Sequence, residues 1–106
     1  MAKQPQHNPL PTHLRAWRDQ VATDFAIVDA PGLALLEQAV LALHRAETAR
    51  ALLDAEGLTL PDRFGQPKPH PAAVIVRDAE SSFRSALRDL RLDLEPARPV
   101  GRPSGT

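Results

Sequence analysis

"DAPGLALLEQAVLALHRAETARALLDAEG" spans residues 29–57 and predicts the longest helix of the chain. Asp29 is a candidate N-cap, and Pro31 stands near the first turn, where its missing N–H costs little. Gly57 is a residue that commonly ends a helix. We therefore expect one long helix over residues 31–56, with the rest of the chain arranged around it.

The apolar surface of this helix is wider than one partner needs. Two seams follow helical spacing, one rich in leucine and one rich in alanine. The first consists of Leu33, Leu36, Val40 and Leu43. The second consists of Leu35, Ala39, Ala42, Ala46, Ala49 and Leu53. We predict that one seam packs within a helical hairpin and that the alanine-rich seam, which permits close approach, forms an oligomer interface with a neighbouring copy. Burial of both seams within one subunit is the alternative.

Shorter helices are expected on both sides. The first should run from Thr12, a plausible N-cap, to about Phe25, with an apolar stripe of Leu14, Trp17, Val21 and Phe25. The last should run from His70 or Pro71 to about Leu92, with an apolar stripe of Ile75, Ala79, Phe83, Ala86 and Leu90. The connector "LTLPDRFGQPKP" (58–69) is expected to lack regular structure, because its prolines, glycine and aspartate favour turns.

These elements predict an all-α protein: a long helical hairpin plus a third helix after a Pro-rich connector. Residues 1–11 are expected to form a flexible arm, residues 12–92 the helical domain, and residues 93–106 a disordered, basic, Pro-rich tail. A chain of 106 residues without cysteine buries a small core and has no disulfide to support it. Self-association is the remaining way to stabilise it.

Charge is unevenly distributed although the formal net charge is zero, since both ends are basic and the middle is acidic. The last helix also carries four roughly aligned arginines, Arg77, Arg84, Arg88 and Arg91. They fit a ridge facing phosphate, or a solvated face neutralised by intrahelical pairs such as Glu80 with Arg84. From the sequence we favour the neutralised face.

Residues suited to catalysis are scarce. The chain has no cysteine or tyrosine, its mid-helix serines lack a nucleophile elbow, and its four histidines form no helical metal pair. We expect no enzyme, no cofactor, no metal and no small-molecule substrate. No window approaches the roughly 18 apolar residues of a membrane span, and the N-terminus lacks an apolar signal core. We expect no membrane contact and a cytoplasmic location.

Several stretches together resemble the small subunit of bacteriophage terminases, in the short branch with a helical hairpin and a Pro-rich connector. The stretches are "LRAW" (14–17), "DAPGLALL" (29–36), "LLDAEGL" (52–58), "GQPKPHPAAVIVRDA" (65–79) and "FRSALRDLRLDLEPARPVGRP" (83–103). The resemblance runs from Leu10 to Pro103, and its most specific part is 65–79. The signature positions there are Pro69, His70, Pro71, Ala72, Arg77, Asp78 and Ala79.

This resemblance implies a non-catalytic DNA-packaging factor. Such subunits form homo-oligomeric rings, bind double-stranded viral DNA, and deliver it to a terminase large subunit that holds the ATPase motor and the nuclease. A bacteriophage, a prophage and a gene transfer agent are all compatible settings. The tail, residues 93–106, is the expected contact with the large subunit. The alternative is a helical oligomeric adaptor or structural phage protein that binds no DNA.

Within this interpretation, candidate site residues follow from charge. We expect weak DNA binding directed mostly at the phosphate backbone, because no recognition helix of the helix-turn-helix type is evident. The first candidates are Lys3, Arg15 and Arg18, and the second are Arg98 and Arg102. Arg77 and Asp78 are expected to form an ion pair within or between subunits, at the oligomer interface.

Overall fold

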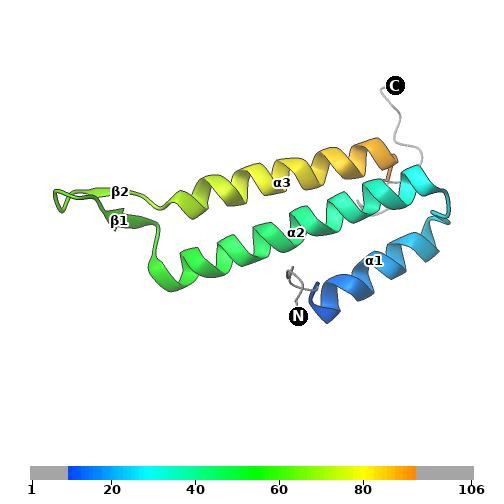
Figure 1. Ribbon diagram of the computed structural model, residues 1–106, viewed down its shortest axis with the longest axis horizontal. Helices are drawn as coiled ribbons and strands as arrows, with labels where there is room; N and C mark the ends of the chain where they lie inside the picture. Colours follow the sequence, from blue (N-terminus) through cyan, green and yellow to red (C-terminus); the bar gives the residue numbers. More distant parts are fainter. Residues whose placement is uncertain (1–9, 93–106) are drawn as a thin grey trace, which may run out of the picture.

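A computed structural model describes residues 10–92 of the protein. It contains α1 (Thr12–Asp24), α2 (Ala30–Glu56), β1 (Thr59–Pro61), β2 (Pro67–Pro69) and α3 (Pro71–Leu90). The helices α2 and α3 lie antiparallel along most of their length, and α1 lies against the first half of α2 (Figure 1). The predicted all-α class with a long helical hairpin is confirmed. The hairpin joins α2 to α3 across the Pro-rich connector, whereas the prediction placed it before that connector. The predicted arm and tail lie outside the described residues, apart from residues 10 and 11.

The ends of α2 follow from the residues that cap it. Asp29 accepts a hydrogen bond from the Gly32 backbone N–H at 2.9 Å, which satisfies one of the unpaired donors of the first turn. At the other end, Gly57 adopts a φ of 90° and donates its N–H to the Leu53 carbonyl at 2.7 Å. The predicted start and stop of the long helix are thus correct to within one residue.

The helix α1 begins and ends differently from the prediction. Pro11 occupies the N-cap position and no side chain caps this end, so Thr12 is not the cap. The helix ends at Asp24, before Phe25, because Ala26 takes a left-handed φ of 52°. The Ile27 N–H then reaches back to the Ala22 carbonyl at 2.9 Å, and Ile27 is buried. This arrangement is a helix C-cap with a hydrophobic contact, and it turns the chain from α1 into α2.

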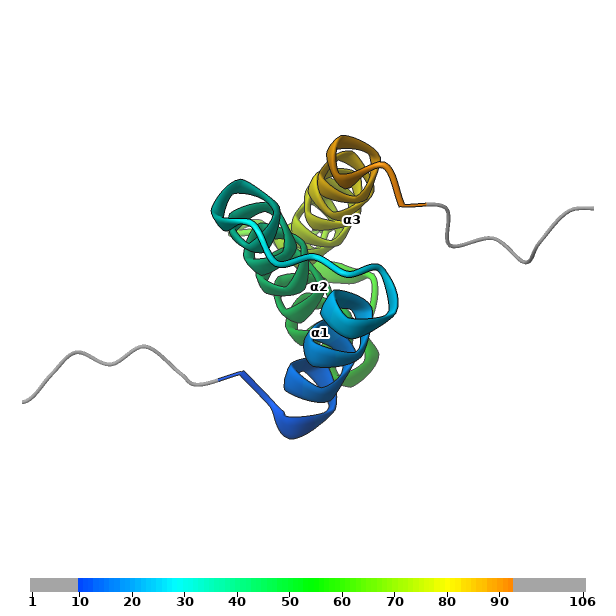
Figure 2. The same ribbon diagram turned by 90° about the vertical axis from the view of Figure 1, so that its right-hand side faces the viewer.

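Large apolar side chains gather where all three helices meet. The most deeply buried of them are Leu14, Leu36 and Val40. The rings of Trp17 on α1 and Phe83 on α3 lie 5.7 Å apart, centroid to centroid, and are tilted by 50°, a favourable aromatic arrangement. Figure 2, seen along the helices, shows this three-helix end, where α2 has α3 on one side and α1 on another.

Alanines fill the interface between α2 and α3. The alanine-rich seam of α2 is buried within the subunit through Ala39, Ala42, Ala46 and Ala49. Three alanines of α3 are equally buried, Ala72, Ala79 and Ala86. The prediction that this seam faces a neighbouring copy is therefore wrong for these four residues, because small side chains let α3 pack closely against them. Leu35 and Leu53, at the two ends of the seam, are only partly buried.

The α3 stripe also differs from its prediction at one position. Ile75 is 45% exposed, while Ala72 and Leu87 are buried instead. Methyl-sized side chains bring the two helix backbones together, so a larger side chain such as Ile75 lies at the edge of the contact. The apolar periodicity identified the buried face of α3 to within about one residue position.

The connector is not irregular, contrary to the prediction. Strands β1 and β2 pair antiparallel, with Thr59 opposite Pro69, Leu60 opposite Lys68 and Pro61 opposite Pro67. In a two-stranded sheet every strand is an edge, so the missing N–H groups of the prolines can face away from the partner strand. The resulting β-hairpin continues beyond the ends of α2 and α3 (Figure 1).

Candidate nucleic-acid interface

Four arginines form a row on the outer face of α3. Arg77, Arg84, Arg88 and Arg91, with Ser81 among them, follow one another at helical spacing, and all four are exposed. Ala79 and Ala86 occupy the opposite, buried face of the same helix. The row, defined as these four arginines, extends about 21 Å along the helix axis at the usual helical rise. It places four exposed cations along one side of α3, with the exposed acids Asp78 and Asp89 on the same helix.

Acidic partners for most of the row are missing within residues 10–92. Glu80, the expected partner of Arg84, instead forms an ion pair with Arg50 of α2. Arg88 donates to the Ser85 hydroxyl at 3.2 Å, and only Arg77 approaches a carboxylate, that of Asp78 at 4.0 Å. The expectation of a face neutralised by its own acids is therefore wrong for Glu80 with Arg84. Because Glu80 pairs with Arg50 of α2, its negative charge is offset by that arginine rather than by Arg84.

Part of the row lies at the C-terminal end of α3, where the helix dipole stabilises positive charge without neutralising it. Arg88 lies in the last turn of α3 and Arg91 is its C-cap residue, where the helix dipole stabilises cations by roughly 0.3–1 kcal/mol. A dipole leaves the hydrogen-bonding fork of each guanidinium free. Such forks match phosphate oxygens well, so the row has the chemistry of a backbone-directed nucleic-acid contact.

The arginines predicted to bind DNA from α1 are less available. Arg18 contacts Asp19 at 3.2 Å and Glu37 of α2 at 3.3 Å, and its charge is largely offset. Arg15 is exposed, and it donates to the Leu10 carbonyl at 2.7 Å and the Thr12 hydroxyl at 3.3 Å. Lys3, Arg98 and Arg102 lie outside the described residues. Sequence reasoning ranked α1 above α3 because it assumed that the acids of α3 pair within α3.

The pair Arg77 and Asp78 is weak within the subunit. Their closest atoms are 4.0 Å apart, and both side chains are more than 70% exposed. Exposed pairs of this kind contribute about 0–1 kcal/mol. The pair therefore adds little to the stability of one subunit.

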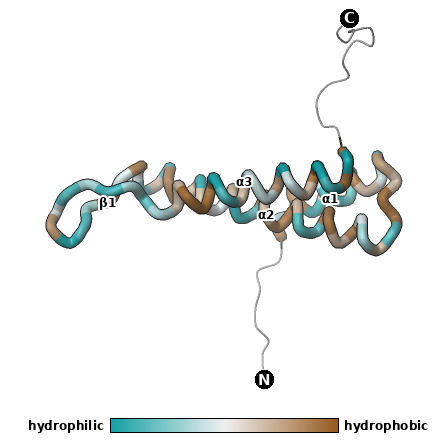
Figure 3. The backbone as a smooth tube through the Cα atoms, turned by 90° about the horizontal axis from the view of Figure 1, so that it is seen from above, coloured by the Kyte–Doolittle hydropathy of each residue, from teal (hydrophilic) through white to brown (hydrophobic). Residues whose placement is uncertain are grey.

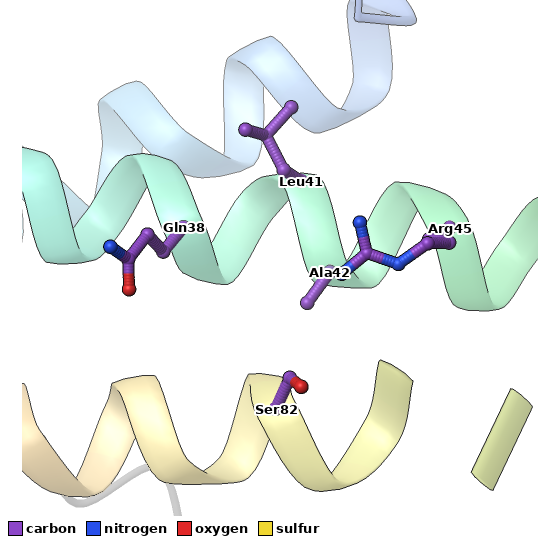
Figure 4. A pocket seen from close by; sticks show the side chains of 5 residues that line it. All are labelled: Gln38, Leu41, Ala42, Arg45 and Ser82. Atoms are coloured by element: carbon purple, nitrogen blue, oxygen red, sulfur yellow. The ribbon is translucent and has the colours of Figure 1, made fainter. Parts of the chain in front are cut away.

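A shallow groove runs between α2 and α3. It comprises two adjoining hollows of about 300 and 320 Å³ that share Arg45. One is lined by Gln38, Leu41, Ala42, Arg45 and Ser82, with Ser82 facing α2 from α3 (Figure 4). The other is lined by Arg45, Thr48, Ala49, Leu52, Ala72 and Ile75. We call these residues together the α2/α3 groove; its largest apolar side chains, Leu41, Leu52 and Ile75, are each more than 40% exposed.

The histidine of the "KPHP" stretch has a structural role. His70 is only 4% exposed, and its Nδ1 accepts a hydrogen bond from the Ala72 N–H at 2.9 Å, which caps α3. Because Nδ1 is the acceptor, the ring proton is on Nε2, which donates to Glu56 at 2.8 Å. The His70 backbone N–H donates to the Leu58 carbonyl at 2.8 Å. One residue therefore joins the end of α2, the base of the β-hairpin and the start of α3, and we call this arrangement the His70 clamp.

Two further features were expected to be absent, a metal site and a membrane span, and the structure can be inspected for both over residues 10–92. No three His, Asp or Glu side chains in this range are grouped to hold a metal ion. No described helix is both long enough and apolar enough to cross a membrane. No family model, curated protein or solved structure matches the chain. The family resemblance therefore rests on the sequence stretches quoted above, and the interface rests on its own geometry.

Proposed function

We propose that the protein is the small subunit of a phage-type terminase, a non-catalytic DNA-packaging factor that binds duplex DNA and delivers it to a large ATPase and nuclease subunit. The observation that carries this proposal is the arginine row, in which Arg84, Arg88 and Arg91 have no carboxylate within ion-pair distance in residues 10–92. The resemblance over residues 10–103 supplies the packaging context for this DNA contact.

The chemistry of the row favours backbone contacts. Guanidinium groups bind phosphate oxygens, while the intervening Ser81 is too short to read base edges across a groove. Each phosphate that an arginine neutralises releases counterions, so affinity falls steeply as salt rises. Binding by one subunit with three or four such contacts is weak, and a ring of subunits multiplies it.

Self-association is part of the proposal, with the α2/α3 groove as its surface. The alanines once expected at the interface are occupied within the subunit, whereas Leu41, Leu52 and Ile75 remain exposed along the groove. A hydrophobic strip of this kind on a small domain is a typical contact between subunits. The docking of residues 93–106 on the large subunit remains a prediction, since this tail lies outside the described residues.

DNA binding by the row is tested with two double variants that remove equal charge. Arg84→Gln/Arg88→Gln removes two arginines of the row, and Arg15→Gln/Arg18→Gln removes two arginines of α1 and leaves the Arg50–Glu80 ion pair in place. Affinity for a 30-base-pair duplex is measured by fluorescence anisotropy at several salt concentrations. We expect the row variant to reduce the slope of log K against log salt by about 1.8, at about 0.9 per phosphate contact, and the matched variant to reduce it much less.

The outcomes separate the alternatives. Loss of binding in the matched variant alone would move the interface to α1, where Arg15 and Arg18 were first predicted. A wild-type protein that shows no salt-sensitive affinity for duplex DNA would reject the packaging role in favour of the adaptor. The α2/α3 groove specifically favours that second function, because an apolar groove is suited to a protein partner rather than to phosphate.

A further inference from the structure

The tip of the β-hairpin presents an exposed aromatic ring beside a cation. Phe64 is 78% exposed, and the Arg63 guanidinium carbon lies 5.6 Å from the centre of its ring. Figure 3 colours the rest of the hairpin mostly as hydrophilic, and Phe64 belongs to neither of the two core clusters formed around Leu36 and around Ala39. Turn formation does not require an aromatic residue at this place.

The tip is held in one conformation by its backbone. The Asp62 carboxylate accepts hydrogen bonds from the Phe64 N–H at 2.8 Å and from the Gln66 N–H at 2.9 Å. The Asp62 N–H donates to the Gln66 carbonyl at 2.8 Å, and Gly65 supplies the left-handed φ of 82°. The His70 clamp secures the base of the same hairpin. A contact made by Phe64 therefore costs little additional ordering of the backbone.

The charges around the ring favour an anionic partner. Arg63 and Lys68 are exposed on the hairpin, and the one acid of the tip, Asp62, directs its carboxylate at backbone N–H groups. Docking of the tip into the α2/α3 groove of a second copy is disfavoured, because Arg45 lines both hollows of that groove and would face Arg63. An aromatic ring flanked by cations is instead the combination that holds a nucleobase next to its phosphates.

We propose that the hairpin tip is a second DNA contact, in which Phe64 stacks on a nucleobase while Arg63 and Lys68 engage the adjacent phosphates. The base is reached in one of two ways. The ring wedges between base pairs from the minor groove, as apolar side chains of DNA-bending proteins do, or it stacks on a base in a single-stranded segment. This inference rests on the proposed DNA-binding function and adds to it a contact that depends on bases rather than on charge alone.

The test uses the full chain and DNA labelled with 2-aminopurine, as a duplex and as a single strand of the same sequence. Phe64→Ala is compared with Leu58→Ala, a matched control that removes an equally exposed apolar side chain from the hairpin base. We expect Phe64→Ala to weaken binding roughly five- to a hundredfold and Leu58→Ala to leave it unchanged. Phe64→Trp should retain affinity, since indole also stacks.

Fluorescence distinguishes the two ways of reaching the base. A rise in 2-aminopurine emission on the duplex, lost in Phe64→Ala, supports wedging; quenching on the single strand, lost in the same variant, supports stacking. Emission and affinity that do not depend on Phe64 on either DNA would overturn the inference. If Phe64→Ala binds DNA like wild type while the row variant loses binding, the inference about the hairpin tip is rejected and the proposed DNA-binding function stands.

Discussion

The two ends of the helical hairpin are held together by different means. At the three-helix end, α1 covers the first half of α2, and large side chains such as Leu14, Leu36 and Val40 are fully buried. At the two-helix end, the second half of α2 packs mainly against the first half of α3, across alanines, and contacts α1 through Glu47 and His13, 2.8 Å apart. The His70 clamp and the β-hairpin close the structure there. There the large apolar residues Leu52, Ile75 and Phe64 are exposed.

The size of the buried side chains determines how much each end contributes to the stability of the fold. Burial of large side chains stabilises the three-helix end, since each contributes roughly 1.5–3 kcal/mol when fully buried. Alanines contribute less, so the two-helix end depends more on polar contacts at its closure. The same small residues leave room beside them for a groove with exposed leucine and isoleucine. The two-helix end therefore combines lower intrinsic stability with the β-hairpin tip and the Leu52 and Ile75 part of the groove, whereas Arg84, Arg88 and Arg91 lie at the three-helix end.

The largest effect expected from this comparison is at Leu36. Leu36→Ala should lower the free energy of unfolding by about 2–5 kcal/mol, because it leaves a cavity where three helices meet. Leu52→Ala, the same substitution at the two-helix end, should cost about 1 kcal/mol because that side chain is already 42% exposed. Urea denaturation monitored by circular dichroism measures both. Equal losses would contradict the division into two ends.

An intermediate effect is expected at the His70 clamp. His70→Ala removes the cap of α3 and the bond to Glu56, and should cost about 1–3 kcal/mol. His70→Asn retains a capping oxygen but is too short to reach Glu56, so it should recover about 1 kcal/mol of that loss. Hydrogen exchange should become faster at the two-helix end first. If the asparagine variant is no more stable than the alanine variant, capping is not the role of the ring.

The smallest effect on folding is expected in the α2/α3 groove. Leu52→Gln/Ile75→Gln should change the unfolding free energy by about 1 kcal/mol and should lower the solution mass measured by light scattering. The matched control, Leu33→Gln/Val74→Gln, removes one leucine of α2 and one valine of α3 with similar exposure, at positions that do not line the groove. A mass that falls only in the control, or a wild-type protein that is monomeric, would reject the groove as the subunit contact.

Much of the local structure was predictable because it depends on neighbouring residues. Asp29, Pro31 and Gly57 determine the ends of α2 through short-range hydrogen bonding and steric limits. The His-Pro step before α3 was expected to start a helix, and it does, at Pro71. The β-hairpin was missed because prolines were read as excluding strands, although they are compatible with the edges of a two-stranded sheet.

The alignment of the four arginines could be predicted from the sequence, but whether nearby acids neutralise them could not. Its spacing follows from helical periodicity alone, whereas the partner of Glu80 depends on which residue of α2 comes near it, and that residue is Arg50. The exposed ring of Phe64 carried no sequence signal of its own, because its isolation depends on the hairpin projecting beyond the helices (Figure 1).

The sequence by itself determined the three helices, the caps of α2 and most of the apolar faces, since these arise from interactions over a few residues. Only the tertiary structure decided that the alanine seam faces α3 rather than another copy, that Glu80 leaves Arg84 unpaired, and that Leu52 and Ile75 line an open groove. The physical reason is that each of these outcomes depends on how closely two helices approach and at what register, and residues far apart along the chain set both.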